Sequence, residues 1–69
     1  MSDNVADALV GEMARVRDEV LPAYLEIGPP GVFAASMMRA VLSEAAQALA
    51  EGSAVRCIRA LRELQGYQT

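Results

Sequence analysis

Three arginines, Arg56, Arg59 and Arg62, recur at every third position near the end of this 69-residue sequence. On a helix this spacing places the guanidinium groups along one side, where they could contact phosphates or carboxylates. The plainer interpretation is a solvated face whose positive charge also complements the negative end of the helix dipole. The arginine row therefore indicates a charged surface that suits an acidic protein or a nucleic acid.

Negative charge gathers in the first part of the chain. Residues 1–28 contain six acids and two arginines, and the net charge of the chain is −3 with a pI near 4.6. This balance disfavours binding to duplex DNA through phosphate neutralisation. A face with Asp7, Asp18, Glu19 and Glu26 is usually only solvated. Its sharper interpretation is mimicry of nucleic-acid charge, offered to a basic DNA-binding surface.

The sequence offers no set of residues typical of catalysis. Cys57 is the single cysteine and there is no histidine, so neither an activated thiolate nor a structural zinc site is expected. None of the carboxylates is isolated in an apolar stretch that would raise its pKa. Gly28-Pro29-Pro30-Gly31 lacks the lysine of a phosphate-binding loop, because the chain contains no lysine. We therefore expect no enzyme activity, no metal and no cofactor.

Two aromatic residues, Tyr24 and Phe33, flank the glycine-proline quartet. They could anchor a partner or pack on each other. Methionine-rich apolar surfaces can adapt to several partners, although in a chain this small most methionines must be core or interface. The residues expected at partner-binding surfaces are Asp18, Glu19, Tyr24, Glu26, Phe33, Arg39, Arg56, Arg59 and Arg62.

Apolar residues at steps of three or four predict a first helix over about residues 4–27. Ser2, Asp3 and Asn4 are candidates for its N-cap. Pro22 lies inside this run, where a proline removes one backbone hydrogen bond and crowds the preceding turn. Because the stripe stays in phase on both sides of Pro22, we expect one kinked helix. The stripe comprises Val5, Leu9, Met13, Val16, Val20, Tyr24 and Ile27, with Asp7, Arg15, Asp18, Glu19 and Glu26 on the opposite side.

The glycine-proline quartet predicts a corner between two helices. Gly28 suits the left-handed residue that ends a helix, Pro29 prevents its continuation, and Pro30 suits the first position of the next helix. We expect the second helix over about residues 30–51. A corner this short folds the second helix back beside the first as a helical hairpin.

A third, shorter helix is predicted over about residues 53–65, with Ser53 as its N-cap and Gly66 at its end. Its spacing buries Ala54, Cys57, Ile58, Leu61 and Leu64 and turns the arginine row outward. The last residues, Tyr67, Gln68 and Thr69, are expected to form a loose tail.

The predicted fold is one all-α domain over residues 1–69, a helical hairpin with a short third helix. A chain of this size buries too little surface to be very stable alone, and a disulfide or zinc site is excluded. Hydrophobic residues make up 54% of the chain and the mean hydropathy is +0.22, so we expect a packed or intertwined homodimer. The expected core and dimer residues are Val16, Val20, Met37, Met38, Val41, Leu42, Leu49, Ile58 and Leu61.

The N-terminus has no basic, apolar pattern of a signal peptide, and no apolar run approaches the length of a membrane span. The expected location is the cytoplasm in which the chain is made, with Cys57 as a thiol.

The run from Ile27 to Leu64, IGPPGVFAASMMRAVLSEAAQALAEGSAVRCIRALREL, resembles small helical proteins of Mu-like temperate phages of Pseudomonas. The matching features are Ile27-Gly28-Pro29, Gly31, Phe33, Met37, the alanines of the second helix, and Glu51-Gly52 before an arginine-bearing helix. Size and hairpin plan are similar to those of the quorum-sensing anti-activators of such phages.

This resemblance implies a homodimer in the bacterial host cytoplasm. It further implies binding to a host LuxR-type transcription factor and to the type IV pilus assembly ATPase, without indicating which residues bind. Two alternatives stay open. One is a helix-turn-helix regulator that contacts DNA through Arg56, Arg59 and Arg62. The other is a structural subunit of a larger assembly.

Overall fold

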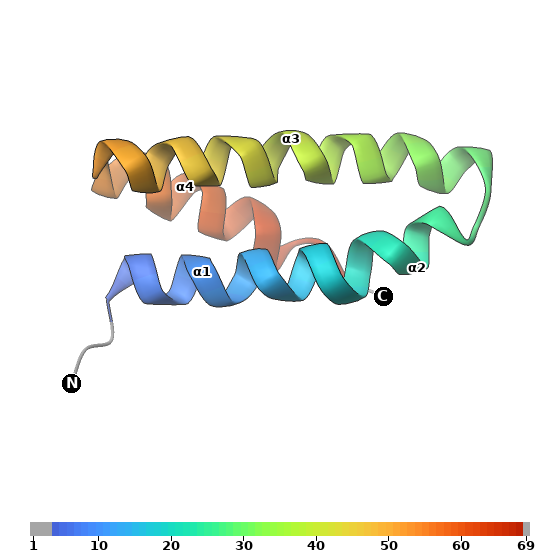
Figure 1. Ribbon diagram of the computed structural model, residues 1–69, viewed down its shortest axis with the longest axis horizontal. Helices are drawn as coiled ribbons and strands as arrows, with labels where there is room; N and C mark the ends of the chain where they lie inside the picture. The colour runs from blue at the N-terminus through green and yellow to red at the C-terminus, as the bar shows by residue number, and fades with distance from the viewer. Residues whose placement is uncertain (1–3, 69) are drawn as a thin grey trace.

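The computed structural model describes residues 4–68, and these are all-helical, without strands (Figure 1). The first helical arm comprises α1 (Val5–Arg15), the π-helical turn η1 (Val16–Val20) and α2 (Leu21–Leu25). The long helix α3 (Pro29–Glu51) runs back beside this arm, and α4 (Ala54–Gln65) packs against both α1 and α3. The all-α fold with three helical segments is as predicted, whereas the homodimer stays a prediction.

The helical arm passes through Pro22 by means of a π turn. The Leu21 N–H donates to the Val16 carbonyl, five residues back, so the turn directly before Pro22 holds one residue more than an α turn. A wider turn suits this position because a proline ring crowds the carbonyl four residues before it. The additional residue rotates the part of the apolar stripe that follows η1 about the helix axis. As a result Leu21 is buried and Ile27, predicted to lie on the buried stripe, is exposed.

Gly28 begins α3 and does not end the first arm as a left-handed residue, so that prediction was wrong. The arm ends at Leu25, and Gly28 is the N-cap of α3 with a φ of 105° and a ψ of −153°. Residues with a side chain rarely adopt this backbone conformation, whereas glycine adopts it readily. Pro29, rather than Pro30, is therefore the first residue of α3.

Residue types that favour helix caps occupy the remaining helix ends. Asn4 accepts a hydrogen bond from the Asp7 N–H at 2.8 Å, whereas Ser2 and Asp3 lie outside the described residues. Gly52 ends α3 in the left-handed region at a φ of 69°. Ser53 accepts from the Arg56 N–H, which confirms its predicted role as N-cap of α4.

The buried residues include part of the predicted core and several small residues, which let the three helical segments approach closely. Of the predicted core residues, Val16, Val20 and Met38 are fully buried. Val41, Leu42, Leu49 and Leu61 are partly buried against the core. Met37 and Ile58 lie on the surface of the single chain, so they are not core residues, and their place in a dimer interface stays a prediction. Ala54 is exposed, which contradicts its predicted burial. The remaining buried residues are Leu9, Leu21, Gly31, Ala35, Ala45, Ala48, Cys57, Ala60 and Leu64.

Candidate functional site

The corner between α2 and α3 carries Phe33, the most exposed large apolar side chain of the described residues. Phe33 is 71% exposed and Ile27 is 62% exposed. Met37 follows Phe33 by one helical turn and is also exposed, so the two share one side of α3. We call Ile27, Phe33 and Met37 the corner patch. Exposed apolar side chains at one end of a molecule are candidates for protein contacts.

Backbone packing holds the corner patch in place. Gly31, in the first turn of α3, lies directly against the backbone of Tyr24 in α2, and a Cβ at this position would lie 1.7 Å from the Tyr24 carbonyl oxygen. The two helix ends can therefore meet only because residue 31 has no side chain. This contact sets where Ile27 and Phe33 emerge on either side of the turn.

Tyr24 was expected beside Phe33 at the partner surface, and in the structure it contacts the C-terminal segment. Its ring is half-buried, and its hydroxyl donates to the Gln68 carbonyl at 3.1 Å. Together with Ala23, Ile27 and Gln68 it lines a hollow of about 310 Å³ beside the corner patch. Tyr24 thus supports the C-terminal segment while forming one wall of an accessible hollow.

The acidic residues Asp18, Glu19 and Glu26 are exposed, as predicted. Asp18 does not stand as an unbalanced charge, because Arg17 donates to it from Nε at 2.8 Å and from Nη2 at 3.0 Å. The hydrogen bond from Arg17 lowers the pKa of Asp18 below its usual value. Glu19 and Glu26 have no ion-pair partner within residues 4–68, and Glu26 directly precedes the corner patch.

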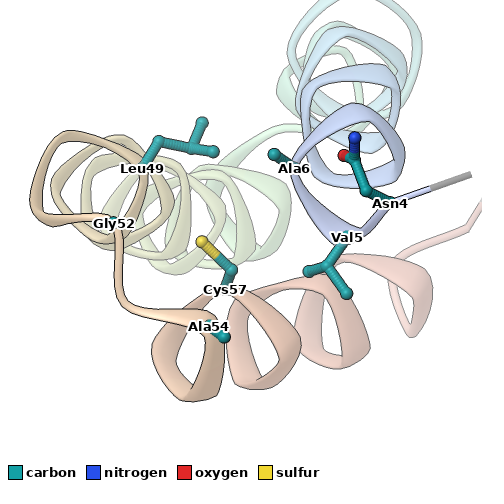
Figure 2. A pocket seen from close by; sticks show the side chains of 7 residues that line it. All are labelled: Asn4, Val5, Ala6, Leu49, Gly52, Ala54 and Cys57. Atoms are coloured by element: carbon teal, nitrogen blue, oxygen red, sulfur yellow. The ribbon is translucent and has the colours of Figure 1, made fainter. Parts of the chain in front are cut away.

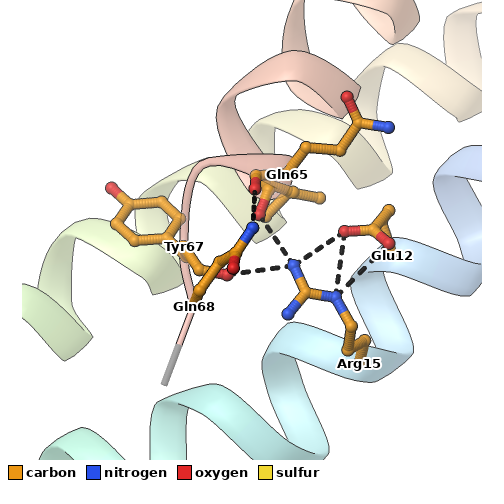
Figure 3. Close-up of polar contacts among 6 residues, drawn as sticks. Glu12, Arg15, Gln65, Tyr67 and Gln68 are labelled. Atoms are coloured by element: carbon orange, nitrogen blue, oxygen red, sulfur yellow. Dashed lines mark hydrogen bonds and ion pairs between the residues drawn. The ribbon is translucent and has the colours of Figure 1, made fainter.

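Arg15 connects the first arm to the C-terminal segment, a role that sequence reasoning missed (Figure 3). Its Nη2 donates to Glu12 at 2.8 Å, to the Leu64 carbonyl at 3.1 Å and to the Tyr67 carbonyl at 2.9 Å. The hydrogen bond with Glu12 raises the pKa of Arg15. The Leu64 carbonyl belongs to the last turn of α4, where carbonyls lack partners within the helix.

The contact with Arg15 orders the segment after α4. Tyr67 is half-buried against the core, so the expected loose tail is wrong for Tyr67 and Gln68, while Thr69 lies outside the described residues. Arg15 itself was expected on the solvent side of the first helix. The one available signal is Glu12 three residues before it, a spacing that also occurs on ordinary exposed faces.

The arginine row divides into two parts. Arg56 is half-buried and forms ion pairs with Glu44 and Glu51 of α3, which raise its pKa. Arg59 and Arg62 are exposed and have no ion-pair partner among the described residues. The same holds for Arg39 on α3. Because two carboxylates neutralise Arg56, the row does not present three guanidinium groups to a phosphate backbone.

A second hollow, of about 390 Å³, lies at the end of the molecule where α1 and α4 begin and α3 ends (Figure 2). The Cys57 sulfur points toward the space between α1 and α3. The other lining residues are Asn4, Val5, Ala6, Leu49, Gly52 and Ala54, so Cys57 is the one titratable lining residue. Cys57 is buried and belongs to the core cluster, as expected for a thiol that packs like a small apolar side chain.

Within residues 4–68, no group of three or more histidine, cysteine, aspartate or glutamate side chains is arranged to hold a metal ion. None of the described helices combines the length and the apolar character that crossing a membrane requires. Comparison with models of protein families, with curated proteins and with solved structures finds no match to this chain.

Proposed function

We propose that this chain is a phage-encoded anti-activator, which binds a host LuxR-type transcription factor by protein–protein contact and prevents it from acting on DNA. It acts as a homodimer in the bacterial host cytoplasm, and the type IV pilus assembly ATPase is a second target of the same kind. The resemblance of residues 27–64 to such phage proteins supplies the identity of the targets. The corner patch is the observation that carries the proposal.

The corner patch has the composition of a protein-binding centre. Phe33 and Ile27 expose apolar surface that only a partner would remove from water, and aromatic side chains supply much of the binding free energy at interfaces. Glu26 beside Ile27, and Glu19 further back on the same arm, give the surroundings negative charge. A DNA-binding domain is basic, so this combination complements it in both apolar surface and charge.

The test uses the purified chain and the purified DNA-binding domain of a LuxR-type regulator from a Pseudomonas host. Calorimetry at physiological salt should show binding, and added chain should release promoter DNA from the domain. Phe33→Ala should weaken binding by about tenfold or more, as expected for an aromatic anchor at an interface. Val10→Ala is the matched control, because Val10 is 54% exposed on α1 and lies outside the corner patch.

Two outcomes contradict the proposal. One is the absence of binding to both the regulator domain and the pilus ATPase. The other is direct binding of the chain to promoter DNA in a gel-shift assay, which would favour the helix-turn-helix alternative. Reversing Glu19 and Glu26 to lysine separates the charge contribution, because binding that survives this change unaltered excludes charge mimicry while leaving the apolar contact in place.

A further inference from the structure

The outer side of α4 carries a stripe that the packing of the single chain leaves unused. Five residues share it at the spacing of one helical face, namely Val55, Ile58, Arg59, Arg62 and Glu63. They line a shallow hollow of about 350 Å³. The residues that α4 buries against α1 and α3 lie on its other side and include Cys57, Ala60 and Leu64. We call the five residues the α4 stripe.

The α4 stripe combines apolar and basic groups in order along the helix. Val55 is 64% exposed and Ile58 is 39% exposed, so the first turns of α4 offer apolar surface. Arg59 and Arg62 follow, and neither forms an ion pair within residues 4–68. Glu63 is the single acid of the stripe. The preceding Arg56 differs because Glu44 and Glu51 hold it, so the structure separates a paired arginine from two available ones.

We propose that the α4 stripe binds an acidic amphipathic helix of another protein. Apolar side chains of that helix would cover Val55 and Ile58, while its carboxylates would pair with Arg59 and Arg62. Guanidinium groups recognise carboxylates through paired hydrogen bonds, and helices pack by inserting such rows of side chains into one another.

A nucleic acid fits the α4 stripe less well than an acidic helix. Two available arginines and one glutamate on a chain of net charge −3 give little phosphate neutralisation. The apolar residues Val55 and Ile58 would also remain uncovered by a phosphate backbone. The stripe is distinct from the corner patch, because it lies on another helix and carries the opposite charge, so the two surfaces suit different partners.

The probe is a synthetic, fluorescein-labelled helical peptide of about 20 residues, long enough to hold helical structure in water. Its leucines recur every three or four residues and glutamates flank them. Fluorescence anisotropy should give a micromolar dissociation constant that weakens as salt is raised from about 50 to 200 mM, because exposed charge pairs are screened. The double variant Arg59→Glu/Arg62→Glu should weaken binding at least tenfold.

A charge exchange makes the test specific. The double variant should bind a peptide in which lysines replace the glutamates, which the unaltered chain should not bind. The matched control is Arg17→Glu/Arg39→Glu, which changes the net charge by the same amount at exposed positions outside α4. This control should retain binding to the glutamate peptide within about threefold, since distant exposed charges act weakly. Circular dichroism establishes that each variant is folded.

Several results would overturn the inference. They are failure of the unaltered chain to bind the glutamate peptide at the lower salt, equal weakening by the double variant and its control, and tighter binding to duplex DNA than to the peptide. Self-association abolished by the double variant would assign the stripe to a second copy of the chain instead. Binding of the regulator domain through the corner patch should persist in the double variant, so failure of one proposal is distinguishable from failure of the other.

Discussion

Arg15 shows how one partly buried side chain can organise the end of a small helical protein. Its guanidinium group donates to two backbone carbonyls, that of Leu64 at the end of α4, which also accepts from the Tyr67 N–H at 3.1 Å, and that of Tyr67 in the segment that follows. Glu12 balances its charge from the same helix. Because Arg15 joins the first arm to the C-terminal segment in addition to pairing with Glu12, this contact should contribute more to stability than an ordinary surface ion pair.

Arg15→Ala should therefore lower the free energy of unfolding measurably, because it removes hydrogen bonds between a charged group and two carbonyls. Arg17→Ala is the matched control, because it removes an arginine whose partner Asp18 is exposed, and it should lower the free energy of unfolding less than Arg15→Ala does. Urea denaturation followed by circular dichroism at one protein concentration measures both. Equal losses in the two variants would show that the carbonyl contacts of Arg15 contribute nothing.

Asp18 allows a prediction about pH. Arg17 lowers the pKa of this carboxyl through a direct hydrogen bond. A group whose pKa is lower in the folded state stabilises the fold above its ordinary pKa, and this contribution disappears as the pH falls through the lowered value. Carbon-detected NMR titration should place the Asp18 pKa below that of an ordinary aspartate. Arg17→Ala should return it toward the ordinary value, and Arg39→Ala should not.

At the scale of elements, replacing either of two glycines by alanine should have opposite effects on stability. A Cβ at Gly31 would overlap the Tyr24 carbonyl oxygen, whereas a Cβ at Gly11, inside α1, meets nothing within 4 Å. The first glycine is needed for the approach of α2 to α3. The second only weakens its helix, because glycine is a poorer helix former than alanine.

Gly31→Ala should thus lower the free energy of unfolding by about 3 kcal/mol, at the upper end of what overpacking costs. Gly11→Ala should raise it by about 0.5–1 kcal/mol. Thermal and urea denaturation of the pair measure the difference. A Gly31→Ala variant as stable as the unaltered chain would mean that the α2–α3 corner can open without loss.

The helices and their caps could be predicted from sequence because local chemistry determines them. Asn4 and Ser53 accept N-cap hydrogen bonds, and Gly52 adopts the left-handed conformation that only a few residues tolerate. The exposure of Ile27 could not be predicted in this way. It depends on the rotation that η1 introduces before Pro22 and on the contact at Gly31, both of which arise when the arms pack together.

Burial of alanines was the other limit of sequence reasoning. Ala35 and Ala60 are fully buried because neighbouring helices approach closely, while the larger Met37 and Ile58 remain at the surface. The apolar residues of α3 cover a wider arc than the part in contact with the rest of the chain, since Met38 is buried while the neighbouring Met37 is exposed. The candidate surfaces therefore lie at positions where an apolar pattern exceeds what one chain can cover.

At the scale of the whole molecule, shape limits how much of this surface can be buried. The Cα atoms span 39 × 22 × 15 Å, so the chain is thin in one direction and few side chains are surrounded on all sides. Small domains of this kind commonly gain stability by association. The exposed Met37, next to Phe33 on α3, offers apolar surface that a second copy could cover.

If the chain is a dimer that unfolds to separate chains, its stability must depend on concentration. Raising the protein concentration a hundredfold should increase the apparent free energy of unfolding by about 2.7 kcal/mol per dimer, which follows from mass action. Met37→Ala should reduce this dependence and shift the sedimentation coefficient toward a monomer at low micromolar concentration. Val10→Ala, which changes an exposed apolar residue of α1, should leave both unaltered. A midpoint of denaturation that is independent of concentration in the unaltered chain would show that the fold is stable as a monomer, leaving the corner patch available entirely to other proteins.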